Sequence, residues 1–159
     1  MQNITALLVH HKTQPFLMLK QALARLSVRV HTVGSYREAR EAVAGAGTPH
    51  LVFTDTLLRD GNWADIVALA ARAPAAANVI VVARVVDIHL YAEVLEAGAF
   101  DFIVSPFDSP GLEHVVRCAA DNALAQREMA ERQAQAPQKA LFPSFPQPVS
   151  PAMAGPRTR

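Results

Sequence analysis

Residues 51–63 read LVFTDTLLRDGNW, and this stretch combines a strand pattern, a carboxylate and a turn. Its apolar start has the length of a buried strand and ends at the carboxylate of Asp55. A polar turn containing Gly61 follows at once. In sheets built from alternating strands and helices, the C-terminal tips of the strands carry the chemistry. Asp55 is therefore the first candidate functional residue.

Four further strand-like runs lie on either side of this stretch, and a helical pattern follows each strand. The expected strands are 6–9, 28–32, 51–55, 79–82 and 100–104. The fourth expected helix covers 87–97, ends before Gly98 and is expected to turn four side chains inward: Ile88, Tyr91, Ala92 and Leu95. The fifth helix is expected to start with Ser109 as N-cap and Pro110 in its first turn.

Five strand–helix repeats predict a parallel sheet, because each helix returns the chain to the same edge through a right-handed crossover. The predicted class is therefore α/β, a three-layer sandwich with a five-stranded parallel sheet. This domain is expected to cover residues 4–134. Residues 135–159 contain six prolines without a helical or strand period, and we expect a disordered tail there.

Composition excludes several classes of protein. A net charge of +1 argues against a strongly basic nucleic-acid surface or an acidic tail. The single cysteine, Cys118, excludes an intramolecular disulfide and fits a reducing compartment. No uncharged run reaches the roughly 18 residues expected of a membrane span, and no signal peptide is evident. A soluble cytoplasmic protein without a nucleic-acid or membrane partner is expected.

The residues just past the apolar strands should meet at one edge of the sheet. They are His10, His11, Asp55, Ala83 and Ser105.

With these blocks in order, the chain resembles the receiver domain of bacterial two-component response regulators over roughly residues 4–127. The blocks are ALLV at 6–9, LVFTD at 51–55 with Leu58, Asp60 and Gly61 downstream, and VIVVA at 79–83. The most specific block is LEAGAFDFIVSPF at 95–107. The resemblance implies a flavodoxin-like fold with strand order 2-1-3-4-5.

The resemblance also implies roles for individual positions. In receivers, the residue at Asp55 accepts a phosphoryl group from a sensor histidine kinase. Two acidic residues at positions 10 and 11 would hold magnesium together with Asp55 and the carbonyl of residue 57. A hydroxyl at position 83 and a lysine at position 105 would contact the phosphoryl group, and the bond before Pro106 is expected to be cis.

This chain departs from that pattern at nearly every partner of Asp55. His10 and His11 replace the acidic pair, Ala83 replaces the hydroxyl and Ser105 replaces the lysine. Magnesium prefers carboxylate oxygens, so the two imidazoles should weaken its binding severely. Serine offers only a neutral hydrogen bond where lysine offers a charge. Magnesium-dependent phosphorylation is therefore expected to be impaired.

The histidines leave two interpretations open. Imidazole suits zinc, copper or nickel, and His11, Asp55 and the Leu57 carbonyl would form a weak metal site. In the plainer interpretation, one histidine is exposed and the other pairs with Asp55, which would raise the pKa of that histidine. Arg84 either reaches the pocket as a substitute cation or, as strand alternation favours, points away to the surface.

The leading functional hypothesis is an atypical single-domain response regulator that acts through protein–protein contacts and is not an enzyme. Its partner would be a histidine kinase or another signalling protein, and Tyr91 and Phe102 would mark a homodimer surface over the fourth helix, fifth strand and fifth helix. Buried packing explains these two aromatic residues equally well. The alternatives are a phosphorylation-independent scaffold, a His/Asp metal-binding protein and an aspartate-nucleophile phosphatase. That phosphatase class needs a second acid where this chain has Leu57.

Overall fold

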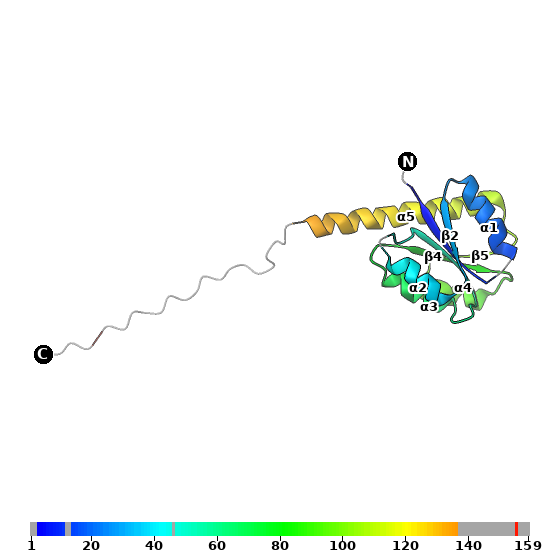
Figure 1. Ribbon diagram of the computed structural model, residues 1–159, viewed down its shortest axis with the longest axis horizontal. Coiled ribbons are helices and arrows are strands. Elements are labelled where there is room, and N and C mark those ends of the chain that lie inside the picture. The colour runs from blue at the N-terminus through cyan, green and yellow to red at the C-terminus, as the bar shows by residue number, and fades with distance from the viewer. Residues whose placement is uncertain (1–2, 12–13, 46, 137–154, 156–159) are drawn as a thin grey trace.

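The computed structural model describes residues 3–11, 14–45, 47–136 and 155. Five strands alternate with five helices through this part of the chain, as the sequence predicts (Figure 1). The strands are β1 (Thr5–Val9), β2 (Arg29–Val33), β3 (Leu51–Asp55), β4 (Asn78–Ala83) and β5 (Asp101–Val104). The helices are α1 (Gln14–Arg25), α2 (Tyr36–Ala44), α3 (Trp63–Ala71), α4 (Ile88–Glu96) and α5 (Ser109–Gln135).

All strand pairs are parallel, and the order β2-β1-β3-β4-β5 confirms the predicted topology. The register pairs Asp55 with Val82 and Ala83 with Val104. The ends of β3, β4 and β5 therefore lie side by side at one edge. The central strands are buried on both faces, which explains their continuous apolar runs.

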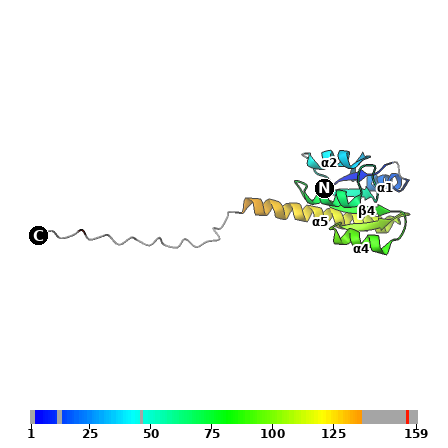
Figure 2. The same cartoon turned by 90° about the horizontal axis from the view of Figure 1, so that it is seen from below.

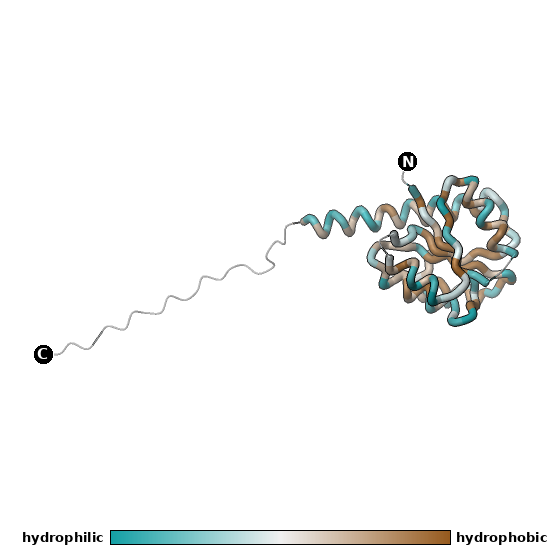
Figure 3. Tube along the Cα trace, viewed as in Figure 1, coloured by the Kyte–Doolittle hydropathy of each residue, from teal (hydrophilic) through white to brown (hydrophobic). Residues whose placement is uncertain are grey.

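Two apolar cores lie on the two faces of the sheet. One contains side chains of α2, α3 and α4, and the other contains side chains of α1 and α5. Figure 1 shows this division of the helices, and Figure 3 shows hydrophobic residues concentrated along the strands between them. The three-layer sandwich predicted from the sequence is confirmed.

The inward face predicted for α4 is wrong. The helix buries Val94 and packs Leu90 against the core, whereas Ile88 is 77% exposed and Tyr91 is 44% exposed. The helix has apolar residues on more than one face, so spacing alone selected the wrong stripe. Gly98, at φ +101°, ends the helix at the predicted position.

The start predicted for α5 is also displaced by one residue. Asp108, not Ser109, is the N-cap, because its carboxylate accepts a hydrogen bond from the Gly111 backbone N–H at 2.8 Å. Aspartate and serine are equally good caps, and Pro110 still lies in the first turn.

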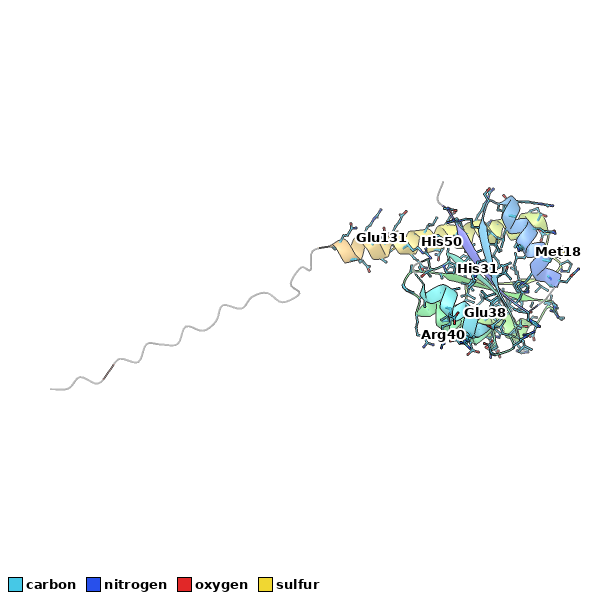
Figure 4. All side chains as sticks on the ribbon, in the orientation of Figure 1. Met18, His31, Glu38, Arg40, His50 and Glu131 are labelled. Carbon is cyan, nitrogen blue, oxygen red and sulfur yellow. The ribbon has the colours of Figure 1, made fainter. Side chains whose placement is uncertain are left out.

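α5 is 27 residues long, and its last turns extend beyond the sheet in both views (Figures 1 and 2). Glu131 lies on this projecting part (Figure 4). The tail predicted for 135–159 falls, beyond Ala136, almost entirely outside the described residues. Within the described part of the chain, no helix is long and apolar enough to span a membrane.

Candidate functional site

Asp55 ends β3, and its side chain is mostly covered, with 14% of its surface exposed. One carboxylate oxygen, Oδ1, accepts a hydrogen bond from the backbone N–H of Thr56 at 2.8 Å. The other, Oδ2, lies 3.9 Å from a guanidinium nitrogen of Arg84. The Asp55 carboxylate is thus held at the strand tip with a cation beside it.

Arg84 reaches this pocket, contrary to the orientation that strand alternation favoured. The reason is that β4 ends at Ala83, so Arg84 lies outside the strand and the alternation of side chains no longer applies to it. Its side chain is 60% exposed. Ser105 stands where the resemblance implies a lysine, and the cation beside Asp55 is Arg84 from the loop after β4.

His10 stacks on Phe16 of α1, with ring centroids 4.3 Å apart and an interplanar angle of 15°. Burial lowers the pKa of His10, and the nearby charge of Asp55 offsets this effect only in part. The expected rise in the pKa of a histidine beside Asp55 is therefore wrong for His10, because desolvation exceeds the attraction.

His11 lies at the rim of the pocket, where its Nε2 contacts the guanidinium of Arg59 from the loop after β3. Because arginine can only donate, the ring nitrogen is the acceptor in this contact. The contact occupies one of the two ring nitrogens through which a histidine can bind a metal ion. The two neighbouring histidines therefore have different environments, one against an aromatic ring and one against an arginine.

Ala83 is 5% exposed and belongs to the apolar core at the end of β4. Ser105 follows β5, and its backbone N–H donates to the Ala83 carbonyl at 2.8 Å. The Ser105–Pro106 peptide bond is cis. The structure brings His11, Asp55, Ala83 and Arg84 to one groove, whereas Ser105 and Pro106 are not part of its lining.

The donor set does not fit magnesium. Asp55 is the only carboxylate among the positions that the family uses for the metal, and the guanidinium of Arg84 lies against it. Within the described residues, no group of three or more His, Cys, Asp or Glu side chains is arranged to hold a metal ion. We therefore assign no metal-dependent step to this site.

The loop after β3 is held in place by bonds from its own backbone and from α2. Leu58 N–H donates to the Gly61 carbonyl at 2.9 Å, and Asn62 and Asp65 form a capping box at the start of α3. The Asp60 carboxylate accepts hydrogen bonds from the backbone N–H groups of Tyr36 at 2.7 Å and Arg37 at 3.0 Å. These two bonds lower the pKa of Asp60.

The apolar rim of the groove was not predicted from the sequence. Four large side chains there are 73–77% exposed: Leu57, Val85, Val86 and Ile88. The groove that they border has a volume of about 890 Å³. The signal in the sequence was the pair Val85-Val86 placed between a strand and a helix cap, where turn residues are usual.

Tyr91 and Phe102, proposed from the sequence as a contact surface, pack against each other edge to face with centroids 5.8 Å apart. Phe102 is 8% exposed, so it is a core residue, and only Tyr91 contributes to the surface.

Comparison with known proteins identifies the fold. No family model matches the chain. A curated relative, the DNA-binding transcriptional regulator NtrC of Azospirillum brasilense, is 30% identical over 105 residues, which are 66% of this chain and 22% of that protein. The chain thus spans about a fifth of that relative.

Solved structures agree over most of the described chain. A response regulator of Chloroflexus aurantiacus superposes with a TM-score of 0.69 at 21% identity, covering 76% of this chain and 99% of that one. The signal receiver domain of an HD domain-containing protein from Pseudomonas fluorescens gives 0.71 at 21% identity, covering 80% and 94%. The architecture that these proteins share is the one derived above.

Proposed function

We propose that this chain, which has the fold of response-regulator receiver domains, is an atypical receiver in two-component signal transduction. It acts through contacts with other proteins and not as an enzyme. Asp55 keeps the phosphoacceptor position, and magnesium-dependent phosphorylation is impaired. The single observation that carries this proposal is the pairing of the Asp55 carboxylate with Arg84 at a site that lacks the acidic pair.

Phosphoryl transfer to a carboxylate depends on positioned cations that offset the charge of the transferring oxygens. Within the described residues, Arg84 is the cation that forms an ion pair with Asp55. Its side chain is 60% exposed, and exposed ion pairs stabilise by only about 0–1 kcal/mol. Such a cation is poorly fixed, so it replaces magnesium and a buried lysine only in part.

A scaffold that works without phosphorylation is the second candidate, and Ala83 favours it. This residue is buried in the core and has no hydroxyl that could follow a phosphoryl group. The serine at 105 adds no charge. In both candidates the output is a protein contact, and the two differ only in whether Asp55 controls it.

The partners that we propose are a sensor histidine kinase or another signalling protein in the cytoplasm. A homodimer over α4, β5 and α5 is a further proposal that follows from the resemblance to receivers. We propose no nucleic-acid or membrane partner. The phosphatase alternative has little support, because its second acid would stand at the exposed, apolar Leu57.

Incubation with acetyl phosphate, with and without magnesium, tests the proposal by intact mass. We expect little or no phosphate-sized gain in either condition. Asp55→Asn is the control that identifies any modified residue. A stoichiometric gain that requires both magnesium and Asp55 would contradict the proposed impairment and restore an ordinary phosphorylation switch.

A further inference from the structure

The groove beside Asp55 carries more exposed apolar surface than the fold uses. Leu57 stands on the loop after β3, Val85 and Val86 follow β4, and Ile88 opens α4. Each of these side chains is 73–77% exposed. Contiguous exposed apolar side chains rimmed by polar groups commonly mark a binding surface.

The backbone under these side chains is ordered by hydrogen bonds. The Asp60 carboxylate holds the loop after β3 against the start of α2, and Trp63 N–H donates to the Thr56 carbonyl at 3.2 Å. Asp87 caps α4 by accepting from the Leu90 N–H at 3.0 Å. The backbone next to Leu57 and Ile88 is therefore held in place, which lowers the entropy cost of binding there.

The groove exposes two cations, Arg59 and Arg84, and one carboxylate, Asp87. Arg59 is exposed, and Arg84 is 60% exposed. Of the two carboxylates in the lining, Asp55 is mostly covered and faces Arg84, while Asp87 is exposed and uses one oxygen to cap the N-terminus of α4. An incoming group thus meets two guanidinium groups beside four apolar side chains.

We propose that this groove binds an acidic, amphipathic segment of a partner protein, with apolar side chains on the rim and carboxylates at Arg59 and Arg84. The inference deepens the proposed function, on which it rests, by giving the chemistry of the protein contact. It applies to the unphosphorylated protein.

Charge argues against the two other occupants. Residues 137–159 of the chain include Lys139, Arg157 and Arg159 and no Asp or Glu, so their charge is repelled by the same arginines. A second copy docked groove to groove would bring Arg59 and Arg84 near their own counterparts, and like charges in an interface cost affinity.

The test uses the full chain, without a phosphoryl donor, and two synthetic amphipathic helical peptides. Both carry leucines at i, i+3, i+4 and i+7; one has glutamates on the flanking positions and the other has lysines. Binding is measured by fluorescence anisotropy, and the bound surface is mapped by backbone amide chemical shifts. We expect saturable binding of the acidic peptide at least about tenfold tighter than the basic one, with shifts centred on Leu57, Val86 and Ile88.

Val86→Glu should weaken binding of the acidic peptide at least about tenfold. The matched control is Leu17→Glu, since Leu17 is an exposed apolar residue (55%) on α1 and outside the groove lining. Arg59→Glu should invert the preference toward the basic peptide. Unchanged thermal midpoints confirm that the three variants are folded.

Several outcomes overturn the inference: no saturable binding, equal affinity for both peptides, shifts outside the groove, or equal losses in Val86→Glu and Leu17→Glu. Displacement of the acidic peptide by a peptide of residues 137–159 would assign the groove to the chain's own tail. A dimer disrupted by Val86→Glu would assign it to a second copy. Because no phosphoryl donor is present, these results are independent of the phosphorylation test above.

Discussion

Polar residues make different contacts at the two edges of the sheet: the amino edge, where the parallel strands begin, and the carboxyl edge, where they end. At the amino edge, Arg127 of α5 donates to three backbone carbonyls, those of Ala76, Thr48 and Pro49, at 2.8–2.9 Å. The Asn78 side chain, also at this edge, donates to the Ala119 carbonyl at 2.8 Å. These bonds join α5 to the loops that precede β3 and β4.

At the carboxyl edge, the Arg84 guanidinium approaches a carboxylate at 3.9 Å and remains largely exposed, and apolar side chains border an open groove. At the amino edge, polar side chains therefore stabilise the fold. At the carboxyl edge, cations and apolar side chains remain exposed. Substitutions at the two edges should separate stability from binding and phosphorylation.

The largest expected effect is a gain of function at the carboxyl edge. In a variant with His10→Asp, His11→Asp, Ala83→Thr and Ser105→Lys, we expect phosphorylation by acetyl phosphate to increase at least about tenfold, because magnesium ligands and a fixed cation are restored. Intact mass with and without magnesium measures it. The same variant with Asp55→Asn is the control. A folded variant that gains no phosphate would mean that the four substitutions do not explain the impairment.

Arg127→Ala should produce the largest loss of stability, about 2–3 kcal/mol in the free energy of unfolding, because charge-assisted hydrogen bonds to three carbonyls are lost. Urea unfolding measures this loss. Arg132→Ala, in the exposed last turns of the same helix, is the matched control and should stay within about 0.5 kcal/mol. Equal effects of the two substitutions would remove the proposed distinction between the edges.

Asp60→Ala should cost about 1 kcal/mol of unfolding free energy, because the carboxylate caps α2 from another loop. The pKa of Asp60 is lower in the folded state, so this contribution is present above the unfolded value of about 3.9 and is lost as the pH falls through the folded pKa. Urea unfolding at neutral and acid pH measures it, with Asp60→Asn as the control that keeps one acceptor. A pH-independent difference would contradict the capping role.

The smallest expected effect concerns two histidines, one at each edge. Burial lowers the pKa of His10 and of His50; Asp55 raises that of His10, and Arg127 lowers that of His50 further. Asp55→Ala should therefore lower the pKa of His10 and leave His50 unchanged. Proton NMR titration of the imidazole rings measures both. A shift of His50 would show that the two edges are not independent, and no shift of His10 would show that Asp55 does not raise its pKa.

The same two pKa values predict a pH dependence of stability. A histidine whose folded pKa lies below the unfolded value of about 6.5 favours the neutral form in the folded state. Its stabilising effect is therefore present above about pH 6.5 and is lost as the pH falls through the folded pKa.

The sequence predicts the sheet well because its signals are local. Apolar runs of strand length alternate with helical patterns, and Gly98 and the proline at 110 stand at helix ends as expected. The α4 face was predicted wrongly because Ile88 and Tyr91 have the spacing of a core stripe while the adjacent Leu90 and Val94 provide the actual contact. Which of these two faces of α4 is buried depends on how the helix packs against β5 and its neighbours.

The sequence predicts which residues meet at the candidate site but not which of their side chains contact one another. The strand tips placed Asp55, His11 and Ala83 together. The approach of Arg84 was not predicted, because Arg84 lies beyond the end of β4 at Ala83, where the alternation of strand side chains no longer fixes its direction. Arg127 gave no signal at all, since an arginine near a helix end is usually solvated, and its carbonyl partner Thr48 lies 79 residues away.

The length of α5 has a practical consequence for labelling. The helix starts beside the carboxyl edge and spans 27 residues, about 40 Å, so it ends well past the amino edge. A fluorophore or surface tether placed near Gln135 would therefore stand far from the groove and leave it accessible. A probe at the start of the helix, near Ser109, would stand at the carboxyl edge, on the same side of the sheet as the groove.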